Sequence, residues 1–347
     1  MPIPAIQHVV LLQAFGGPDC LTVVERPVPE PHAGEVLVKV LAASVQFTDI
    51  MLRKGQYPDL KEKPPLVLGY DLVGEVVKVG PGIASLTVGQ RVADLTMIGS
   101  YAQYRTLLAD HCVVVDASLD PAEATSLVLS WTTAYQLLHR DADVKEGQKL
   151  LVIGAAGAVG QALVVLGKLA GCQVWGAASS RHANLVEALG ATHVNRDLID
   201  YALVLQERFD VVFDGIAEQG FSRAWRAVGP RGHLSAFGVS AGVKSNVSIA
   251  LVGFWLARLW WWNLFSSNRS TSFFSITSLR KKHPKWFVED LDQLLDMLKR
   301  GAIKPSIAER IGLDHVAEAH VRIESGGLEG KIVLVPNARS ELQMKTA

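Results

Sequence analysis

Apolar and polar side chains alternate along much of the first third of the chain, which is the period of a strand with one buried face. Short stretches rich in proline and glycine separate these runs and indicate turns. Many short strands separated by such turns predict a small, barrel-like β module over residues 1 to about 125. The runs that predict strands are 35–42, 72–80, 90–93 and 112–115.

From about residue 130 the pattern changes, because buried-looking apolar runs now alternate with segments of helical period. Strands that alternate with helices predict a parallel, doubly wound sheet. An amphipathic helix over 286–300, closed by Gly301, and a last strand at 331–335 follow. The other predicted strands are 149–153, 173–177, 209–214 and 232–238, and the predicted helices are 130–140, 181–189 and 221–227.

The run 149–153 leads into a tight turn and then into a helix with an apolar face. The turn has the spacing of a Rossmann-type phosphate loop, with alanine in place of the first glycine. Gly157 lets a pyrophosphate approach the backbone, Gly160 lets strand and helix pack closely, and the helix N-terminus supplies amide donors. The predicted dinucleotide site comprises Ala155, Ala156, Gly157, Ala158, Val159 and Gly160.

The end of the next strand bears on the choice of cofactor. A unit that binds NAD usually places Asp or Glu here to hold the ribose hydroxyls, whereas this chain has Ser179, Ser180 and Arg181. Hydroxyls and a cation favour a 2′-phosphate and therefore NADPH, with Arg196 as a second cation. The alternative is that Arg181 only lies at a solvated helix start.

Composition narrows the class of protein. A chain of 347 residues predicts two domains, and 34 basic against 34 acidic residues without a basic block argue against nucleic acid as a main partner. The distant cysteines Cys20, Cys112 and Cys172 suit a reducing compartment. The N-terminus shows no signal-peptide pattern, so the expected location is cytoplasmic.

An ordered set of motifs resembles the medium-chain dehydrogenase/reductase superfamily along nearly the whole chain. Within it the chain looks like the zinc-free quinone oxidoreductase branch, which is zeta-crystallin-like, and most like the vesicle amine transport protein 1-like group through residues 49–57 and 268–269. The superfamily motifs lie at 34–40, 69–76, 88–92, 133–135, 155–160, 209–214 and 330–334.

The resemblance implies an α/β fold in which a GroES-like β-rich catalytic domain accompanies a Rossmann domain with a doubly wound parallel sheet. The expected boundaries are 1–128 for the first part of the catalytic domain, 129–270 for the Rossmann domain, and 271–347 for the return to the catalytic domain with a loose tail. It also implies an active site in the cleft and, often, a homodimer.

The resemblance also suggests where zinc would bind in related alcohol dehydrogenases. Those enzymes carry a Cys ligand in the region 44–49 and a Gly-His-Glu motif where this chain has Gly69-Tyr70-Asp71. Neither region offers the thiolate or imidazole that a catalytic zinc prefers, so no metal is expected. His315 and His320, five residues apart, are expected on a helix surface.

Without zinc, another group must stabilise negative charge on a substrate oxygen. Tyr57 matches a tyrosine that zinc-free reductases place near the nicotinamide, and Gln46 stands where many relatives carry Asn. Tyr57 is alternatively a turn residue covering the barrel, and Asp49 is expected to cap the following helix. The resemblance further assigns Thr133, Tyr135, Phe237, Gly238 and Lys331 to the cofactor. Tyr135 is alternatively a helix-core residue, and Lys331 alone would be interpreted as a strand-edge charge.

Residues 247–265 are unusually apolar and rich in tryptophan. The length is nearly that of a membrane span, but Arg258 near the centre argues against one. A buried or dimer-facing helix is the plain interpretation. Two more specific interpretations are possible functions of this helix. The first is an aromatic lid for a large apolar substrate, formed by Phe254, Trp255 and Trp261. The second is a surface that contacts lipid, and the sequence favours the lid over it.

These observations predict a zinc-independent, NADPH-dependent reductase. It would transfer hydride to a quinone or to the C=C bond of an α,β-unsaturated carbonyl, with Tyr57 or Gln46 holding the oxygen. The substrate would be a small apolar molecule, and a bulky or biosynthetic enone fits the aromatic segment. The alternative is a non-catalytic NADPH-binding interaction protein or membrane-associated protein on the same fold.

Overall fold

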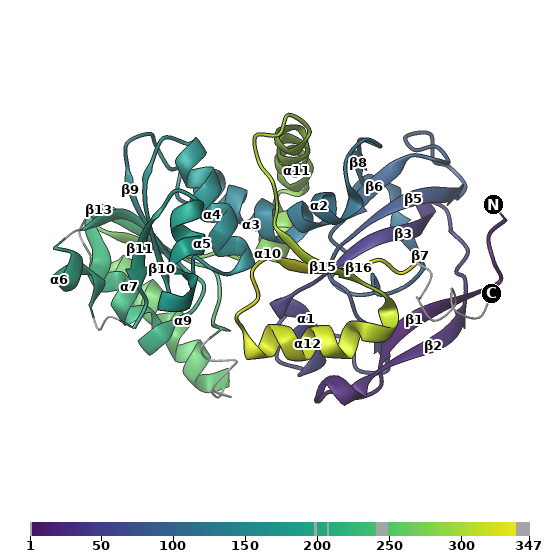
Figure 1. Cartoon of the computed structure of the whole chain (residues 1–347), viewed down its shortest axis with the longest axis horizontal. Coiled ribbons are helices and arrows are strands. Elements are labelled where there is room, and N and C mark those ends of the chain that lie inside the picture. Colours follow the sequence, from purple (N-terminus) through teal and green to yellow (C-terminus); the bar gives the residue numbers. More distant parts are fainter. Residues whose placement is uncertain (1, 198–199, 207, 241–248, 267, 338–347) are drawn as a thin grey trace. The chain divides into compact units, whose positions relative to one another are not determined.

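The structure is a computed structural model that describes residues 2–197, 200–206, 208–240, 249–266 and 268–337. The chain forms two compact units, and Figure 1 labels their helices and strands. Unit 1 comprises Met1–Leu129 and Val288–Ala347, and unit 2 comprises Ser130–Phe287. The first boundary lies close to the expected one, whereas the chain returns to unit 1 at residue 288 rather than 271. The difference arises because the segment after residue 270 first adds strand β14 (Ser270–Phe273) to the sheet of unit 2.

Unit 1 is the predicted β-rich module. One sheet has the order β2-β1-β4, and a larger one has the order β15-β16-β3-β5-β6-β8, with β7 also paired to β3. The C-terminal strand β16 pairs antiparallel with β3, so the end of the chain completes the sheet that its first third begins. The strands are β1 (Ile6–Leu12), β2 (Leu21–Pro27), β3 (Glu35–Val45), β4 (Leu66–Val67), β5 (Leu72–Val79), β6 (Arg91–Asp94), β7 (Tyr104–Leu108), β8 (Val113–Val115), β15 (Ile307–Ile311) and β16 (Lys331–Leu334).

The helices of unit 1 are short apart from the C-terminal ones. Helix α1 begins at a capping box, in which Asp49 Oδ2 accepts a hydrogen bond of 2.9 Å from the Gln46 amide nitrogen, so the expected capping role of Asp49 is confirmed. The predicted apolar face of α11 is also confirmed, because Phe287, Leu291, Leu294, Leu295 and Leu298 are all buried. The helices are α1 (Phe47–Arg53), α2 (Pro121–Ser126) and α12 (Val316–Ser325), and α11 (Pro284–Lys299) starts in unit 2.

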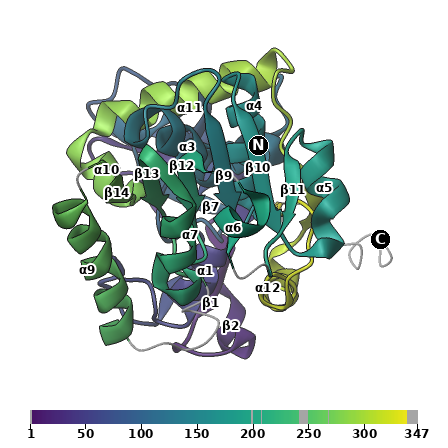
Figure 2. The same cartoon turned by 90° about the vertical axis from the view of Figure 1, so that its left-hand side faces the viewer.

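Unit 2 contains the predicted parallel sheet. Its six described strands have the order β11-β10-β9-β12-β13-β14, and every neighbouring pair is parallel. Figure 2 looks onto this unit and shows the central strands side by side. The other strands are β9 (Lys149–Ile153), β10 (Gln173–Ala178), β11 (Thr192–Asn195), β12 (Phe209–Asp214) and β13 (Val228–Ala236). The helices are α3 (Thr132–Gln136), α4 (Ala158–Leu169), α5 (Ala183–Ala188), α6 (Tyr201–Leu205), α7 (Ser222–Ala227), α9 (Ile249–Phe265) and α10 (Ile276–Lys282).

The strand order has a direct consequence for ligand binding. The chain starts the sheet at β9, adds β10 and β11 on one side, and then crosses to add β12, β13 and β14 on the other. The carboxyl ends of β9 and β12 therefore flank a topological switch point, where open α/β sheets bind ligands. The core beneath this edge includes Leu151, Ile153 and Val212.

Candidate functional site

The turn after β9 has the geometry of a phosphate cradle. Gly154 has a φ of +89°, and α4 begins at Ala158 with Gly157 as its N-cap. A Cβ added to Gly160 would lie 2.2 Å from the Gly154 carbonyl oxygen, so only glycine permits this approach of helix to strand. Gly157 and Ala158 are exposed at the start of the helix, where backbone N–H groups lack partners within the helix. The predicted strand–turn–helix is confirmed, and a dinucleotide pyrophosphate would fit this cradle.

The end of β12 lies beside this turn, and the end of β13 lies next to that of β12. Asp214 ends β12 and is buried, and its Oδ1 accepts hydrogen bonds from the amide nitrogens of Ile216 (2.8 Å) and Ala217 (3.0 Å). Burial raises the Asp214 pKa to about 6. A Cβ on Gly238 would lie 2.7 Å from the Gly215 carbonyl oxygen, so the two strand ends pack closely. Phe237 and Gly238 thus lie at the switch edge, as a role near the cofactor requires.

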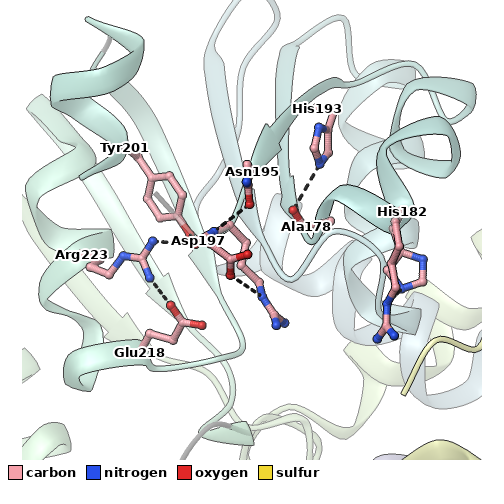
Figure 3. Close-up of polar contacts among 10 residues, drawn as sticks. Ala178, His182, His193, Asn195, Asp197, Tyr201, Glu218 and Arg223 are labelled. Carbon is pink, nitrogen blue, oxygen red and sulfur yellow. Dashed lines mark hydrogen bonds and ion pairs between the residues drawn. The ribbon is translucent and has the colours of Figure 1, made fainter. Parts of the chain in front are cut away.

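The residues expected to bind the 2′-phosphate follow the ends of β10 and β11. The last residues of these neighbouring strands, Ala178 and Asn195, are labelled in Figure 3. Ser179, Ser180 and Arg181 directly follow β10, and Arg181 is exposed. Arg196 follows β11, and its amide nitrogen donates to the Ala178 carbonyl oxygen at 3.0 Å. The two arginines therefore follow the carboxyl ends of neighbouring strands.

The side chains of Arg181 and Arg196 each contact a neighbouring side chain. Arg181 Nε donates to His182 Nε2 at 3.2 Å. Arg196 Nε lies 3.8 Å from Asp197 Oδ1, and both side chains of this pair are well exposed. Surface ion pairs of this kind contribute little free energy, so a phosphate can compete with Asp197 for Arg196.

Thr133 and Tyr135 lie on α3 in unit 2. Thr133 is buried, whereas Tyr135 is partly exposed, with its ring centroid 4.4 Å from that of His139. Tyr135 is therefore not a fully buried core residue. The cofactor role of both residues stays a prediction.

Tyr57 lies in unit 1, in the loop between α1 and β4, and its hydroxyl meets another phenol. The hydroxyl oxygens of Tyr57 and Tyr70 are 2.6 Å apart, and the ring centroids are 5.7 Å apart with an interplanar angle of 84°. Tyr57 is partly exposed and Tyr70 is completely buried. Burial raises the Tyr70 pKa far above its usual value, and the Tyr57 hydroxyl raises it further through its charge and its hydrogen bond. Tyr70 therefore remains a phenol throughout the working pH range.

Gln46 lies instead in a buried polar cluster of unit 1. Its Nε2 donates to Asp71 Oδ2, and its Oε1 accepts from Lys331 Nζ at 2.6 Å. Asp71 Oδ1 also accepts from the Ser44 amide nitrogen at 3.0 Å. Lys331 is 7% exposed, so the interpretation of it as a strand-edge charge is wrong. Sequence reasoning missed this cluster, although Asp71 stands in a motif that was considered for zinc.

Burial governs the titration of this cluster. It raises the Asp49 pKa to about 8, with a further rise from the neighbouring charge of Asp71. It raises the Asp71 pKa to about 6, against the opposing effect of Lys331, and it lowers the Lys331 pKa to about 8. When Asp49 is protonated, the charges of Asp71 and Lys331, which both bind Gln46, cancel, so the cluster has no net charge, and this state carries the smallest desolvation cost for buried groups.

Helix α9 presents two different aromatic faces. Phe254 and Trp261, seven residues apart, are 61% and 56% exposed, whereas Trp255 packs against the core of unit 2. Arg258 donates to the carbonyl oxygens of Gln219 and Gly220. The structure therefore does not bring the three predicted lid residues onto one face. Residues 247 and 248 of this segment lie outside the described residues.

The described residues offer neither a metal site nor a membrane span. Within the described ranges no group of His, Cys, Asp and Glu has the geometry to hold a metal ion, and no described helix is long and apolar enough to span a bilayer. His315 is exposed as expected, but the expectation for His320 is wrong, because His320 is completely buried. Burial, together with the nearby Arg53 charge, lowers the His320 pKa to about 3.

Comparison with protein families gives matches in both units. Residues 32–117 match the alcohol dehydrogenase GroES-like domain, and residues 189–334 match a model described as zinc-binding dehydrogenase. A 2-haloacrylate reductase of Burkholderia sp. is 31% identical over 339 residues, which cover 93% of this chain and 97% of that protein.

Two further relatives also match most of this chain. The synaptic vesicle membrane protein VAT-1 homolog of Rattus norvegicus is 28% identical over 96% of this chain and 85% of its own length. A quinone oxidoreductase of Pseudomonas aeruginosa is 27% identical over 93% of this chain and 98% of its own.

A similar fold is found in the solved structure of mycobacterial Rv1454c complexed with NADPH. It has a TM-score of 0.79 and 26% identity, and the match covers 95% of this chain and 100% of that one. The fold of this chain is thus a GroES-like domain combined with a Rossmann domain. The chain is an oxidoreductase that belongs to the medium-chain dehydrogenase/reductase superfamily, in its zinc-free quinone oxidoreductase and VAT-1 branch.

Proposed function

We propose that this protein is a zinc-independent, NADPH-dependent reductase of quinones or α,β-unsaturated carbonyl compounds. The observation that carries the proposal is the cradle between Gly154 and Gly160 at the switch point of the unit 2 sheet. The Burkholderia relative is named a 2-haloacrylate reductase, and haloacrylates are activated alkenes, which supports an alkene or quinone acceptor.

The proposal assigns the cofactor to residues of unit 2. The turn 155–160 would hold the pyrophosphate through its other amides, because those of Ala155 and Gly157 already donate to the carbonyl oxygens of Ala177 and Gly154. Ser179, Ser180, Arg181 and Arg196 would hold the 2′-phosphate. Thr133, Tyr135, Phe237 and Gly238 would contact the nicotinamide side, and Lys331 of unit 1 keeps its predicted role toward the cofactor. NADPH bound there would supply a hydride to the substrate carbon.

The chain itself must hold the substrate oxygen and deliver a proton. When an enone gains hydride at its β-carbon, the π pair of the C=C bond forms a new double bond between the α-carbon and the carbonyl carbon. The π pair of the C=O bond moves onto the oxygen, which gives an enolate. Tyr57 then gives its hydroxyl proton to the α-carbon and regains a proton from water. Gln46 is the second candidate for holding the oxygen, but its amide is already bound to Asp71 and Lys331, which favours Tyr57.

The experiment is a Tyr57→Phe substitution, assayed with NADPH and a panel of quinones and enones. A general acid contributes roughly 10²-fold or more, so kcat for enones should fall by about that factor. Tyr104→Phe, a partly exposed tyrosine on β7, is the matched control. An undiminished rate in Tyr57→Phe would refute the role of Tyr57.

The exposed face of α9 supports a second candidate, an apolar lid or subunit interface. Phe254, Trp260, Trp261, Leu264 and Phe265 are all more than half exposed. We propose that this face covers a bulky apolar substrate or a second copy of the chain, in preference to lipid. Co-sedimentation with liposomes would overturn that preference, and it would favour the alternative of a non-catalytic, membrane-associated NADPH-binding protein.

We also propose that the protein forms a homodimer and that it lies in the cytoplasm. Strand β14 is an edge of the described sheet, and open edges pair readily with another strand. The three cysteines are free thiols, as expected in a reducing compartment. Sedimentation equilibrium gives the mass in solution, and a monomer would contradict the dimer.

A further inference from the structure

Tyr57 and Tyr70 lie in very different environments. Tyr70 is completely buried, and the partner of its hydroxyl in the described structure is the hydroxyl of Tyr57, 2.6 Å away. Tyr57 is partly exposed and lies in a loop. A buried phenol needs a partner for its proton, whereas a partly exposed one can also use water or a ligand.

The backbone holds Tyr70 rigidly. The preceding Gly69 has a φ of +106°, and a Cβ there would lie 2.5 Å from the Tyr101 amide nitrogen. The Tyr70 carbonyl oxygen accepts from the amide nitrogens of Thr96 (2.9 Å) and Met97 (3.1 Å). The next residue, Asp71, is fixed by the Ser44 amide. The backbone therefore fixes the position of Tyr70, and the ring of the loop residue Tyr57 packs against the Tyr70 ring.

We propose that Tyr70 is a positioning residue for the reaction and donates its hydroxyl proton to the Tyr57 oxygen. This inference rests on the proposed function of Tyr57. With its oxygen accepting from Tyr70, Tyr57 directs its own proton away from the buried side, toward a substrate. The same hydrogen bond stabilises the negative charge that Tyr57 acquires when it gives its proton to the α-carbon.

The high pKa of Tyr70 fits this role. A donor must keep its proton while the acceptor becomes charged, and burial favours the neutral form of Tyr70. The edge-to-face packing of the two rings also limits the rotation of Tyr57. Tyr70 lies in the motif considered for zinc ligation, and we assign this position to the orientation of an acid instead.

The test is a double-mutant cycle with Tyr57→Phe, Tyr70→Phe and the double variant, assayed with NADPH and a long-chain enone. Phenylalanine keeps the ring that packs in the core, so Tyr70→Phe retains its fold. We expect Tyr70→Phe to lower kcat about tenfold with little change in KM, and to have no further effect in the Tyr57→Phe background. Tyr104→Phe should match the wild type.

The outcomes separate this inference from the proposed function. If Tyr57→Phe lowers kcat but Tyr70→Phe does not, the role of Tyr70 is overturned while that of Tyr57 stands. Independent, additive effects of the two substitutions also overturn it, because a merely structural residue acts in either background. If Tyr57→Phe has no effect, both assignments fail.

Discussion

Lys331 and Gln46 lie 285 positions apart in the chain, and a hydrogen bond of 2.6 Å joins Lys331 Nζ to Gln46 Oε1 inside unit 1. The other end of the same amide binds Asp71. Gln46 therefore bridges a buried cation and a buried carboxylate, which connects the start of α1 to strand β16.

Removing this bridge should destabilise unit 1. Gln46→Ala leaves Asp71 Oδ2 and Lys331 Nζ buried without their shared partner, and an unsatisfied buried polar group costs about 1–3 kcal/mol. We expect the free energy of unfolding, measured in urea at neutral pH, to fall by about 2 kcal/mol or more. Gln13→Ala, at an exposed glutamine that bonds Thr22, is the control. Equal stability of the two variants would contradict the bridge.

Asp49 should make stability depend on pH. Its pKa is about 8 in the folded protein against 3.8 for the free side chain, so the folded state binds the proton more tightly. The contribution is complete below pH 4 and is lost as pH rises to about 8, at up to about 1.4 kcal/mol per pH unit. Asp49→Asn keeps the acceptor oxygen and removes the titration.

The measurement is urea unfolding of the wild type and Asp49→Asn between pH 5 and 8. We expect the wild type to lose stability relative to the variant as pH rises. Asp110→Asn, on the surface, controls for the change of charge. A stability difference that stays constant over this range would show that Asp49 is not protonated in the folded protein.

Two glycines of the phosphate turn should respond differently to alanine. In Gly160→Ala the new Cβ would lie 2.2 Å from the Gly154 oxygen, so the variant should lose several kcal/mol of stability or fail to fold. In Gly157→Ala the closest atom is 3.3 Å away, so the variant should fold and bind NADPH more weakly, because the methyl group stands where the pyrophosphate approaches. Isothermal titration and thermal unfolding separate these effects.

A control for this comparison lies on α9, where a Cβ on Gly253 meets no atom within 4 Å. Gly253→Ala should bind NADPH like the wild type and should unfold at the same or a slightly higher temperature, because alanine favours a helix interior over glycine. If Gly157→Ala binds NADPH as tightly as the wild type, the turn does not hold the pyrophosphate.

The two arginines that follow β10 and β11 should set the choice of cofactor. Each charge-assisted contact to a 2′-phosphate contributes about 1.5–3 kcal/mol, so Arg181→Ala and Arg196→Ala should each raise the Kd for NADPH about tenfold or more. The Kd for NADH should change little. The Arg196 carbonyl oxygen, which accepts from Tyr201 and Arg223, survives the substitution, so the fold should be retained.

Arg226→Ala is the matched control, because Arg226 is an exposed arginine of unit 2 that pairs with Asp200. Equal losses of affinity for NADPH and NADH in the Arg181 and Arg196 variants would refute the phosphate pocket.

The phosphate turn was predictable from sequence because its geometry is local. Gly157 and Gly160 follow a buried strand and open a helix, and that order alone determines how the backbone turns. The apolar face of α11 was predictable for the same reason, since its residues recur with the helical period.

The polar interior of unit 1 was not predictable, because its contacts join distant parts of the chain. Nothing in the local pattern around Lys331 or His320 shows that β16 and α12 bury them, and both were expected to be exposed or cofactor-facing. Tyr70 was noticed only as a residue unable to bind zinc, since its partner Tyr57 comes from another element.

The central claim is tested most directly by the steady-state oxidation of NADPH by the purified protein in the presence of a metal chelator, with phenanthrenequinone or a long-chain enone as acceptor. Our account predicts saturable turnover that requires both NADPH and acceptor and is unaffected by the chelator. Tight NADPH binding without turnover on any acceptor, or turnover that the chelator abolishes, would contradict it.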